Sequence, residues 1–126
     1  MKSPTARTLA RCKELGWIAE RTEHWAHGRR HDLFGFADII CLRRNGLLVR
    51  MPHVSGPVAG IVAIQATTGS SKTARLEKII NEKRDNAIEW LTCGGIIEVW
   101  SWYRYADTID ARWWRETITP VTLEML

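Results

Sequence analysis

Apolar residues recur at helical spacing in two stretches of the chain. Residues 4–16 carry a narrow apolar stripe, with Ser3 as an N-cap, Pro4 in the first turn and Gly16 at the end, and so predict an N-terminal helix. Residues 72–91 place their apolar side chains on one face and their charges largely off it, which predicts the main helix of the fold.

Continuous apolar runs and alternating patterns predict the strands. Residues 36–42 and 58–67 are apolar almost throughout, which is typical of strands buried on both faces. Residues 96–105 indicate a later strand, the partial alternation of residues 17–25 indicates an earlier one, and residues 113–118 are a candidate edge strand. The order helix, strand, strand, strand, helix, strand implies a crossover connection, and therefore an α/β fold with a mixed sheet.

The connecting segments are polar or rich in turn-forming residues. Residues 27–30 are predicted as a basic loop, and Asn45-Gly46 favours a turn after which residues 47–51 extend as a hairpin arm. With 126 residues, of which 45% are hydrophobic, the chain is expected to form one domain over residues 1–126 with an ordinary core.

Composition narrows the class of protein. The net charge of +4 makes nucleic acid a natural partner, although many basic proteins bind none. Cys12, Cys41 and Cys93 are widely spaced without a C-x-x-C pair, so we interpret them as buried free thiols rather than disulfides or zinc ligands. Because no apolar run approaches a membrane span and no apolar leader follows Met1, we expect no membrane partner and a cytoplasmic location.

Asp38 interrupts the second predicted strand and is the first candidate for chemistry, because a buried carboxylate is costly unless it is paired or binds a metal. Gln65 and Thr67 share a face of the third strand, and if the two strands are neighbours Gln65 meets Asp38. Carboxylate and amide oxygens suit Mg²⁺ or Mn²⁺, which can support phosphodiester hydrolysis. Two alternatives stay open: Asp38 pairs with Arg29 or Arg30, and Gln65 only hydrogen-bonds across the sheet.

Further acids and an amine lie near this pair in the sequence. Asp32 is a second candidate metal ligand, or else it caps the turn that follows it. The first predicted strand offers Glu20 and Glu23, and Glu20 is favoured because it is on a strand adjacent in sequence. Lys72 follows a polar turn and is the catalytic candidate for orienting water or stabilising the transition state, with a solvated helix-start lysine as the alternative.

Histidines and a lysine-threonine pair suggest other ligands less strongly. His24, His27 and His31 have a spacing that suits zinc on a helix, but the neighbouring Gly28 indicates a loop, so contact with nucleic acid or solvent is favoured. Lys72-Thr73 lacks the glycine spacing of a nucleotide-binding phosphate loop.

Basic and aromatic residues supply the expected contacts to nucleic acid. Trp100 and Trp102 can stack on bases, as can Trp113 and Trp114, although core packing is favoured for the first two. Phosphate contacts are expected from the basic residues near the strand ends, namely Arg29, Arg30, Arg43, Arg44, Lys72 and Arg75.

This arrangement resembles the PD-(D/E)XK nuclease superfamily, and within it small phage-type, Holliday-junction-resolvase-like or VRR-NUC-like domains. The resemblance covers roughly residues 8–114, and the order of helices and strands is its main support. It is carried by Asp32 to Asp38, Ile64 to Gly69, Arg75, Lys78, Trp90-Leu91 and Gly94-Gly95.

The resemblance implies a restriction-endonuclease-like fold, in which a mixed central sheet is flanked by helices. It implies a metal-ligand role for Asp38, and it places Gln65 at the position of the family's second acid. Thr67 stands at the family's lysine position, so Lys72 would compensate. The first helix offers only Glu14 where the family often has a glutamate, and these departures bear on catalysis more than on fold.

The expected function is that of a metal-dependent DNA endonuclease of phage or mobile-element type, acting on branched or duplex DNA. A homodimer is expected from the resemblance, because resolvase-like nucleases cut two strands. The alternative is a catalytically weakened nuclease-fold protein that works as a nucleic-acid-binding or protein-interaction module.

Overall fold

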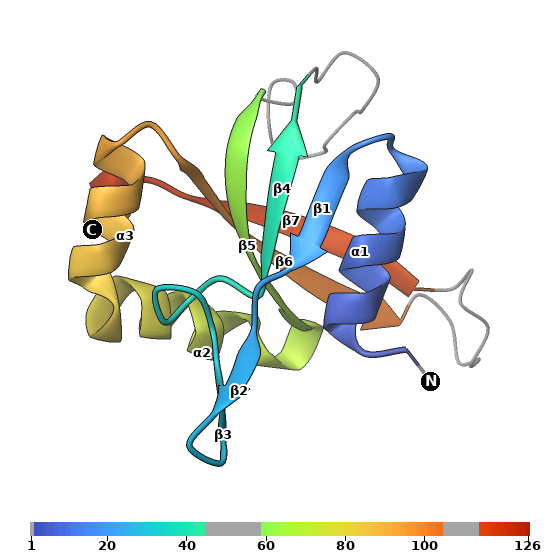
Figure 1. Ribbon diagram of the computed structural model, residues 1–126, viewed down its shortest axis with the longest axis horizontal. Helices are drawn as coiled ribbons and strands as arrows, with labels where there is room; N and C mark the ends of the chain where they lie inside the picture. Colours follow the sequence, from blue (N-terminus) through green and yellow to red (C-terminus); the bar gives the residue numbers. More distant parts are fainter. Residues whose placement is uncertain (1, 45–58, 105–113) are drawn as a thin grey trace.

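The computed structural model describes residues 2–44, 59–104 and 114–126, and a five-stranded mixed sheet forms its centre (Figure 1). The strands lie in the order β1-β4-β5-β6-β7, and all neighbours are antiparallel except β5 and β6. Their bounds are β1 (Ile18–Arg21), β4 (Ile39–Arg43), β5 (Gly60–Thr68), β6 (Ile96–Arg104) and β7 (Trp114–Val121).

Helices cover both faces of this sheet. Helix α1 (Pro4–Glu14) begins as predicted, since the Ser3 hydroxyl accepts a hydrogen bond from the Ala6 amide at 3.1 Å. It packs on the core cluster that includes Trp17, Ile64 and Trp100. The opposite cluster is covered by α2 (Lys72–Glu77), the π-helical turn η2 (Lys78–Glu82) and α3 (Arg84–Thr92). The expected α/β fold with a mixed, helix-flanked sheet is therefore confirmed.

The main helix is interrupted, whereas the sequence predicted it as continuous over residues 72–91. The Lys83 amide bonds to the Lys78 carbonyl at 2.9 Å, which gives the wider π turn. The π turn ends within residues 81–86, which are polar throughout and form the longest gap in the apolar periodicity. Short 3₁₀ turns, η1 (Gly69–Ser71) and η4 (Leu123–Met125), precede α2 and follow β7.

A two-stranded hairpin projects from the body of the protein in Figure 1 and replaces two predicted elements. The predicted strand over residues 17–25 is divided between β1 and β2 (His24–Ala26). The basic loop over residues 27–30 is instead a tight turn that leads into β3 (Arg29–His31). Both turn residues have positive φ, 52° at His27 and 73° at Gly28, which is the conformation of a two-residue hairpin turn.

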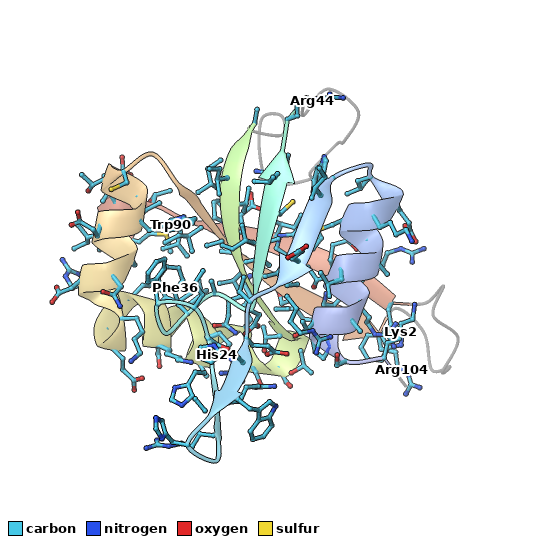
Figure 2. The ribbon with its side chains drawn as sticks, in the orientation of Figure 1. Lys2, His24, Phe36, Arg44, Trp90 and Arg104 are labelled. Atoms are coloured by element: carbon cyan, nitrogen blue, oxygen red, sulfur yellow. The ribbon has the colours of Figure 1, made fainter. Side chains whose placement is uncertain are left out.

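Burial settles several expectations about single side chains. Trp100 and Trp102 are buried in the core, as favoured, and cannot stack on bases. Cys12 and Cys41 are buried free thiols as predicted, but Cys93 is exposed. Figure 2 shows Phe36 and Trp90 on the α3 side of the sheet. The predicted hairpin arm over residues 47–51 and the candidate Trp113 lie outside the described residues.

Arg43 was expected to contact phosphates, and this prediction is wrong because the residue is buried, with only 2% of its surface exposed. Its guanidinium makes a two-pronged ion pair with Glu98 of β6, at 3.0 and 2.9 Å, and lies 5.1 Å from the Trp17 ring centroid. The Trp100 indole N–H also donates to Glu98 at 3.1 Å. Glu98 is distant in sequence, so only the assembled sheet reveals this buried pair.

Candidate functional site

Asp38 lies directly before β4, where backbone hydrogen bonds hold it between two strands. Its amide donates to the Ile64 carbonyl at 2.9 Å, and its carbonyl accepts from the Thr22 amide at 2.7 Å. The side chain is 3% exposed, and its Oδ2 accepts hydrogen bonds from the Gln65 side-chain amide at 2.7 Å and the Ala66 amide at 2.9 Å. The structure thus brings Asp38 and Gln65 together.

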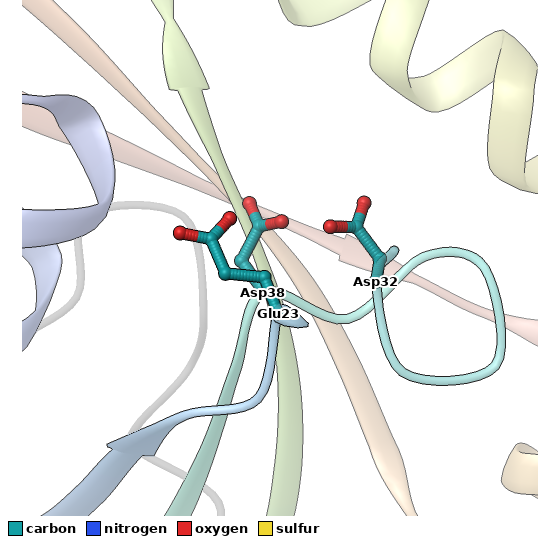
Figure 3. Close-up of side chains that lie close together, drawn as sticks. All are labelled: Glu23, Asp32 and Asp38. Carbon is teal, nitrogen blue, oxygen red and sulfur yellow. The ribbon is translucent and has the colours of Figure 1, made fainter. Parts of the chain in front are cut away.

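Two further carboxylates approach Asp38 from the two ends of the hairpin. Glu23 precedes β2 and Asp32 follows β3, and one carboxylate oxygen from each of the three acids lies within 4.8 Å of the others. Figure 3 shows the side chains of Glu23, Asp32 and Asp38, which we call the acid cluster, gathered at one point. Carboxylates at this range repel one another unless a proton or a cation lies between them.

A tight turn explains why Asp32 and Asp38 meet. Leu33 and Ala37 exchange backbone hydrogen bonds of 2.9 and 3.0 Å, which folds the intervening residues back on themselves. Gly35 has a φ of 82°, in the left-handed region that favours glycine. The apolar-looking Asp32 to Asp38 stretch is therefore a turn that sets two acids side by side, rather than the start of a strand.

Glu23, rather than Glu20, completes the acid cluster. Glu20 lies opposite Ile40 within β1 and is exposed. The β1–β4 register continues to Thr22, whose hydroxyl donates to the Ala37 carbonyl at 2.9 Å, so the residue after Thr22 arrives beside Asp38. Sequence reasoning named both glutamates, and the strand register decides between them.

The electrostatics of the acid cluster favour the protonated form of Asp38. Burial raises the pKa of Asp38 to about 8, and the hydrogen bond and negative charge of Asp32 add to this effect. The Ala66 amide opposes the rise, and the charge of Glu23 adds slightly to it. Without a cation, Asp38 therefore holds a proton at neutral pH, next to Asp32.

Basic side chains pair with the outer acids and not with Asp38. Lys78 Nζ lies 3.5 Å from Asp32 Oδ2. Arg21 lies 3.1 Å and Arg30 3.6 Å from carboxylate oxygens of Glu23. The alternative in which Asp38 pairs with Arg29 or Arg30 is wrong for the described residues, because their ion pairs connect Arg30 to Glu23.

Lys78 is the amine that sequence reasoning did not assign to the site. Lys72 begins α2 and has no ion pair with the acid cluster among the described residues, whereas Lys78 reaches it from η2. Thr67 is buried, and it holds the position where the resembled family has lysine. The contact between Lys78 and Asp32 joins segments distant in the sequence, so the apolar pattern did not predict it.

An unpaired buried oxygen marks the inner side of the cluster. Gln65 donates through its amide nitrogen to Asp38, while its carbonyl Oε1 is buried without a hydrogen-bond partner. Glu23 Oε2 is also buried without a hydrogen bond. Leaving the buried Gln65 carbonyl without a hydrogen bond costs about 1–3 kcal/mol, whereas Glu23 Oε2 is compensated in part by Arg30 Nη1 at 3.6 Å. The three carboxylates form an all-oxygen donor set, which fits Mg²⁺ or Mn²⁺.

The predicted phosphate-contact residues are distributed over several elements. Arg29 and Arg30 are exposed on β3, Arg44 is exposed after β4, and Lys72 and Arg75 are half-buried on α2. A cavity of about 490 Å³ lies elsewhere, between α1 and β7, and its lining includes Arg7 and Trp114 but no member of the acid cluster.

Comparisons of the chain with protein-family models, with curated proteins and with solved structures find no match. Within the described residues, no helix has the length and apolar character needed to cross a membrane.

Proposed function

We propose that this protein is a metal-dependent DNA endonuclease of the PD-(D/E)XK type, with Mg²⁺ or Mn²⁺ held by the acid cluster and Gln65. The observation that carries the proposal is the convergence of Glu23, Asp32 and Asp38 within 4.8 Å, beside the unpaired Gln65 carbonyl. Such oxygen-rich sites are used to hydrolyse phosphodiesters.

Each residue of the site has a role that follows from its position. Asp38 and Glu23 offer buried carboxylate oxygens, and Gln65 holds Asp38 in place through the 2.7 Å hydrogen bond while presenting its own carbonyl. A bound divalent cation supplies charge neutralisation at the phosphate and a lowered pKa for the attacking water. On metal binding Asp38 gives up its proton, so binding is weaker at low pH.

The outer residues of the site suit proton transfer and charge stabilisation. Asp32 accepts the proton of the attacking water as the water oxygen bonds to phosphorus and the bond from phosphorus to the sugar oxygen breaks. Lys78, 3.5 Å from Asp32, stabilises the added negative charge on the phosphate oxygens. The leaving sugar oxygen takes a proton from solvent.

Charge and resemblance support DNA as the substrate. The chain carries a net charge of +4, and Arg29, Arg30 and Arg44 are exposed while Lys72 and Arg75 begin α2. The resemblance to resolvase-like domains supports branched or duplex DNA as the target, a phage or mobile-element origin and a homodimer.

The test is cleavage of branched, duplex and single-stranded DNA with Mg²⁺, Mn²⁺ or EDTA. We expect Asp38→Ala and Glu23→Gln to abolish metal-dependent cleavage, because each removes a proposed ligand. Glu20→Gln is the matched control, since Glu20 precedes the site on the same segment and lies outside the acid cluster. Undiminished cleavage by Asp38→Ala would overturn the proposal.

The second candidate function is a nuclease-like domain that binds nucleic acid without cutting it. It is favoured by the uncharged Gln65 and the buried Thr67, which stand where the resembled family has an acid and a lysine. This candidate predicts salt-dependent DNA binding without metal-dependent cleavage. Strong cleavage by Gln65→Glu, and none by the unaltered chain, would favour it over the first.

A further inference from the structure

The β2–β3 hairpin presents a tryptophan to solvent. Trp25 is 75% exposed, the highest value among the exposed large apolar residues of the described chain. Tryptophan is highly buried on average in folded proteins, so an indole with this exposure on a projecting element calls for a partner. Figure 2 shows the hairpin around His24 standing clear of the sheet and helices.

One face of the hairpin leads from Trp25 to the acid cluster. Trp25 and Arg30 are cross-strand partners, so their side chains lie on the same face. Arg30 Nη1 lies 3.6 Å from Glu23 Oε2, which shows that this face continues to the acids. At about 3.3 Å per strand residue, Trp25 lies roughly 7 Å along the chain from Glu23.

The opposite face of the hairpin is occupied by contacts within the hairpin. The rings of His24 and His31 stack with centroids 5.6 Å apart, and the His31 Nε2 atom lies 3.0 Å from the Ala26 carbonyl oxygen. These contacts stiffen the hairpin. Because Glu23 precedes β2 and Asp32 follows β3, a ligand held on the hairpin is held next to two acids of the site.

We propose that this hairpin is an arm that stacks Trp25 on an unpaired nucleotide base while Arg30, on the same face, contacts the adjoining phosphate. The inference rests on the proposed function, and it names the substrate class as DNA with unpaired nucleotides beside the phosphate that is cut. An exposed indole recognises the face of a base, and that face is covered by neighbouring bases within a regular duplex. The exposed Arg30 beside Trp25 complements the negative charge of the backbone.

Binding is tested first in EDTA, so that it is measured without cleavage. The probes are a labelled blunt duplex and the same duplex with a single-stranded tail, and affinity is read by fluorescence anisotropy. Trp25→Ala is expected to lower the affinity for the tailed duplex about 5- to 150-fold, which corresponds to about 1–3 kcal/mol for one stacked base. The affinity for the blunt duplex is expected to remain unchanged.

Two further variants separate stacking from general effects. Trp25→Phe keeps a ring and is expected to retain most of the affinity for the tailed duplex. Ile18→Ala removes a different exposed apolar side chain, 67% exposed on β1, and is expected to bind both probes like the unaltered chain. Thermal unfolding of each variant shows whether the fold is kept, and the exposure of Trp25 predicts no loss.

The outcomes separate this inference from the proposed function. The proposal of an arm would be overturned if Trp25→Ala bound the tailed duplex as tightly as the unaltered chain does. It would also be overturned if Trp25→Ala lost affinity equally for both probes. If metal-dependent cleavage is observed in either case, the proposed endonuclease function is still supported. A loss confined to the tailed probe, without cleavage under any metal condition, supports the arm and contradicts the endonuclease.

Discussion

Replacing Asp38 by Asn tests the electrostatic account of the site most directly. The buried carboxyl has a pKa near 8 in the folded chain, raised from an ordinary 3.8 by burial and by Asp32. The folded chain therefore binds a proton that the unfolded chain releases between these values, and the free energy of unfolding falls as pH rises through the window. Asn keeps an oxygen for the Gln65 and Ala66 donors but has no proton to lose.

The size of the effect follows from the width of this window. Each pH unit within it lowers the free energy of unfolding by up to about 1.4 kcal/mol. Between pH 5 and pH 7 the unaltered chain is expected to lose about 3 kcal/mol relative to Asp38→Asn. In EDTA at neutral pH, Asp38→Asn is therefore the more stable protein, although it has lost a proposed catalytic group.

Urea denaturation at several pH values, in EDTA and then with Mn²⁺, measures both parts of this prediction. Mn²⁺ is expected to stabilise the unaltered chain above pH 7 and to have little effect on Asp38→Asn, because binding to the folded state alone raises stability. Glu20→Gln serves as the control for loss of a negative charge outside the cluster. A less stable Asp38→Asn at neutral pH in EDTA would show that the reasoning about Asp38 is wrong.

The buried ion pair, the two candidate lysines and the cap of α1 each support a further prediction. Glu98→Gln removes the carboxylate charge of the buried pair with Arg43 and is expected to lower the free energy of unfolding by about 3–5 kcal/mol in urea denaturation, whereas a loss below about 1 kcal/mol would contradict the pair's structural role. Lys78→Ala is expected to slow metal-dependent cleavage on the order of a hundredfold, and Lys72→Ala much less; the opposite ranking would restore Lys72 as the catalytic amine. Ser3→Ala removes the cap of α1 and is expected to lower the free energy of unfolding by about 1 kcal/mol, and unchanged urea denaturation would count against the cap.

Local patterns were sufficient for the central elements of the fold. The continuous apolar runs predicted β4 and β5 to within a few residues, because strands buried on both faces require apolar side chains throughout, and an alternating pattern predicted β6. The same reasoning brought Asp38 and Gln65 to one point, since alternation within a strand decides which residues share a face. These properties depend on neighbours in the sequence.

The tertiary structure decided which charged residues surround that point. Glu23 rather than Glu20 reaches Asp38 because of the β1–β4 register, and Lys78 reaches Asp32 from the first residue of η2. Arg43 of β4 is buried against Glu98 of β6, and these two strands are separated by β5 in the sheet. Charged side chains are long and tolerate many surroundings, so their local pattern carries little information on their partners. Strand register and chain direction depend on contacts between distant segments. For that reason the sequence alone determined the central strands and the meeting of Asp38 with Gln65, and the fold determined which charged residues surround them.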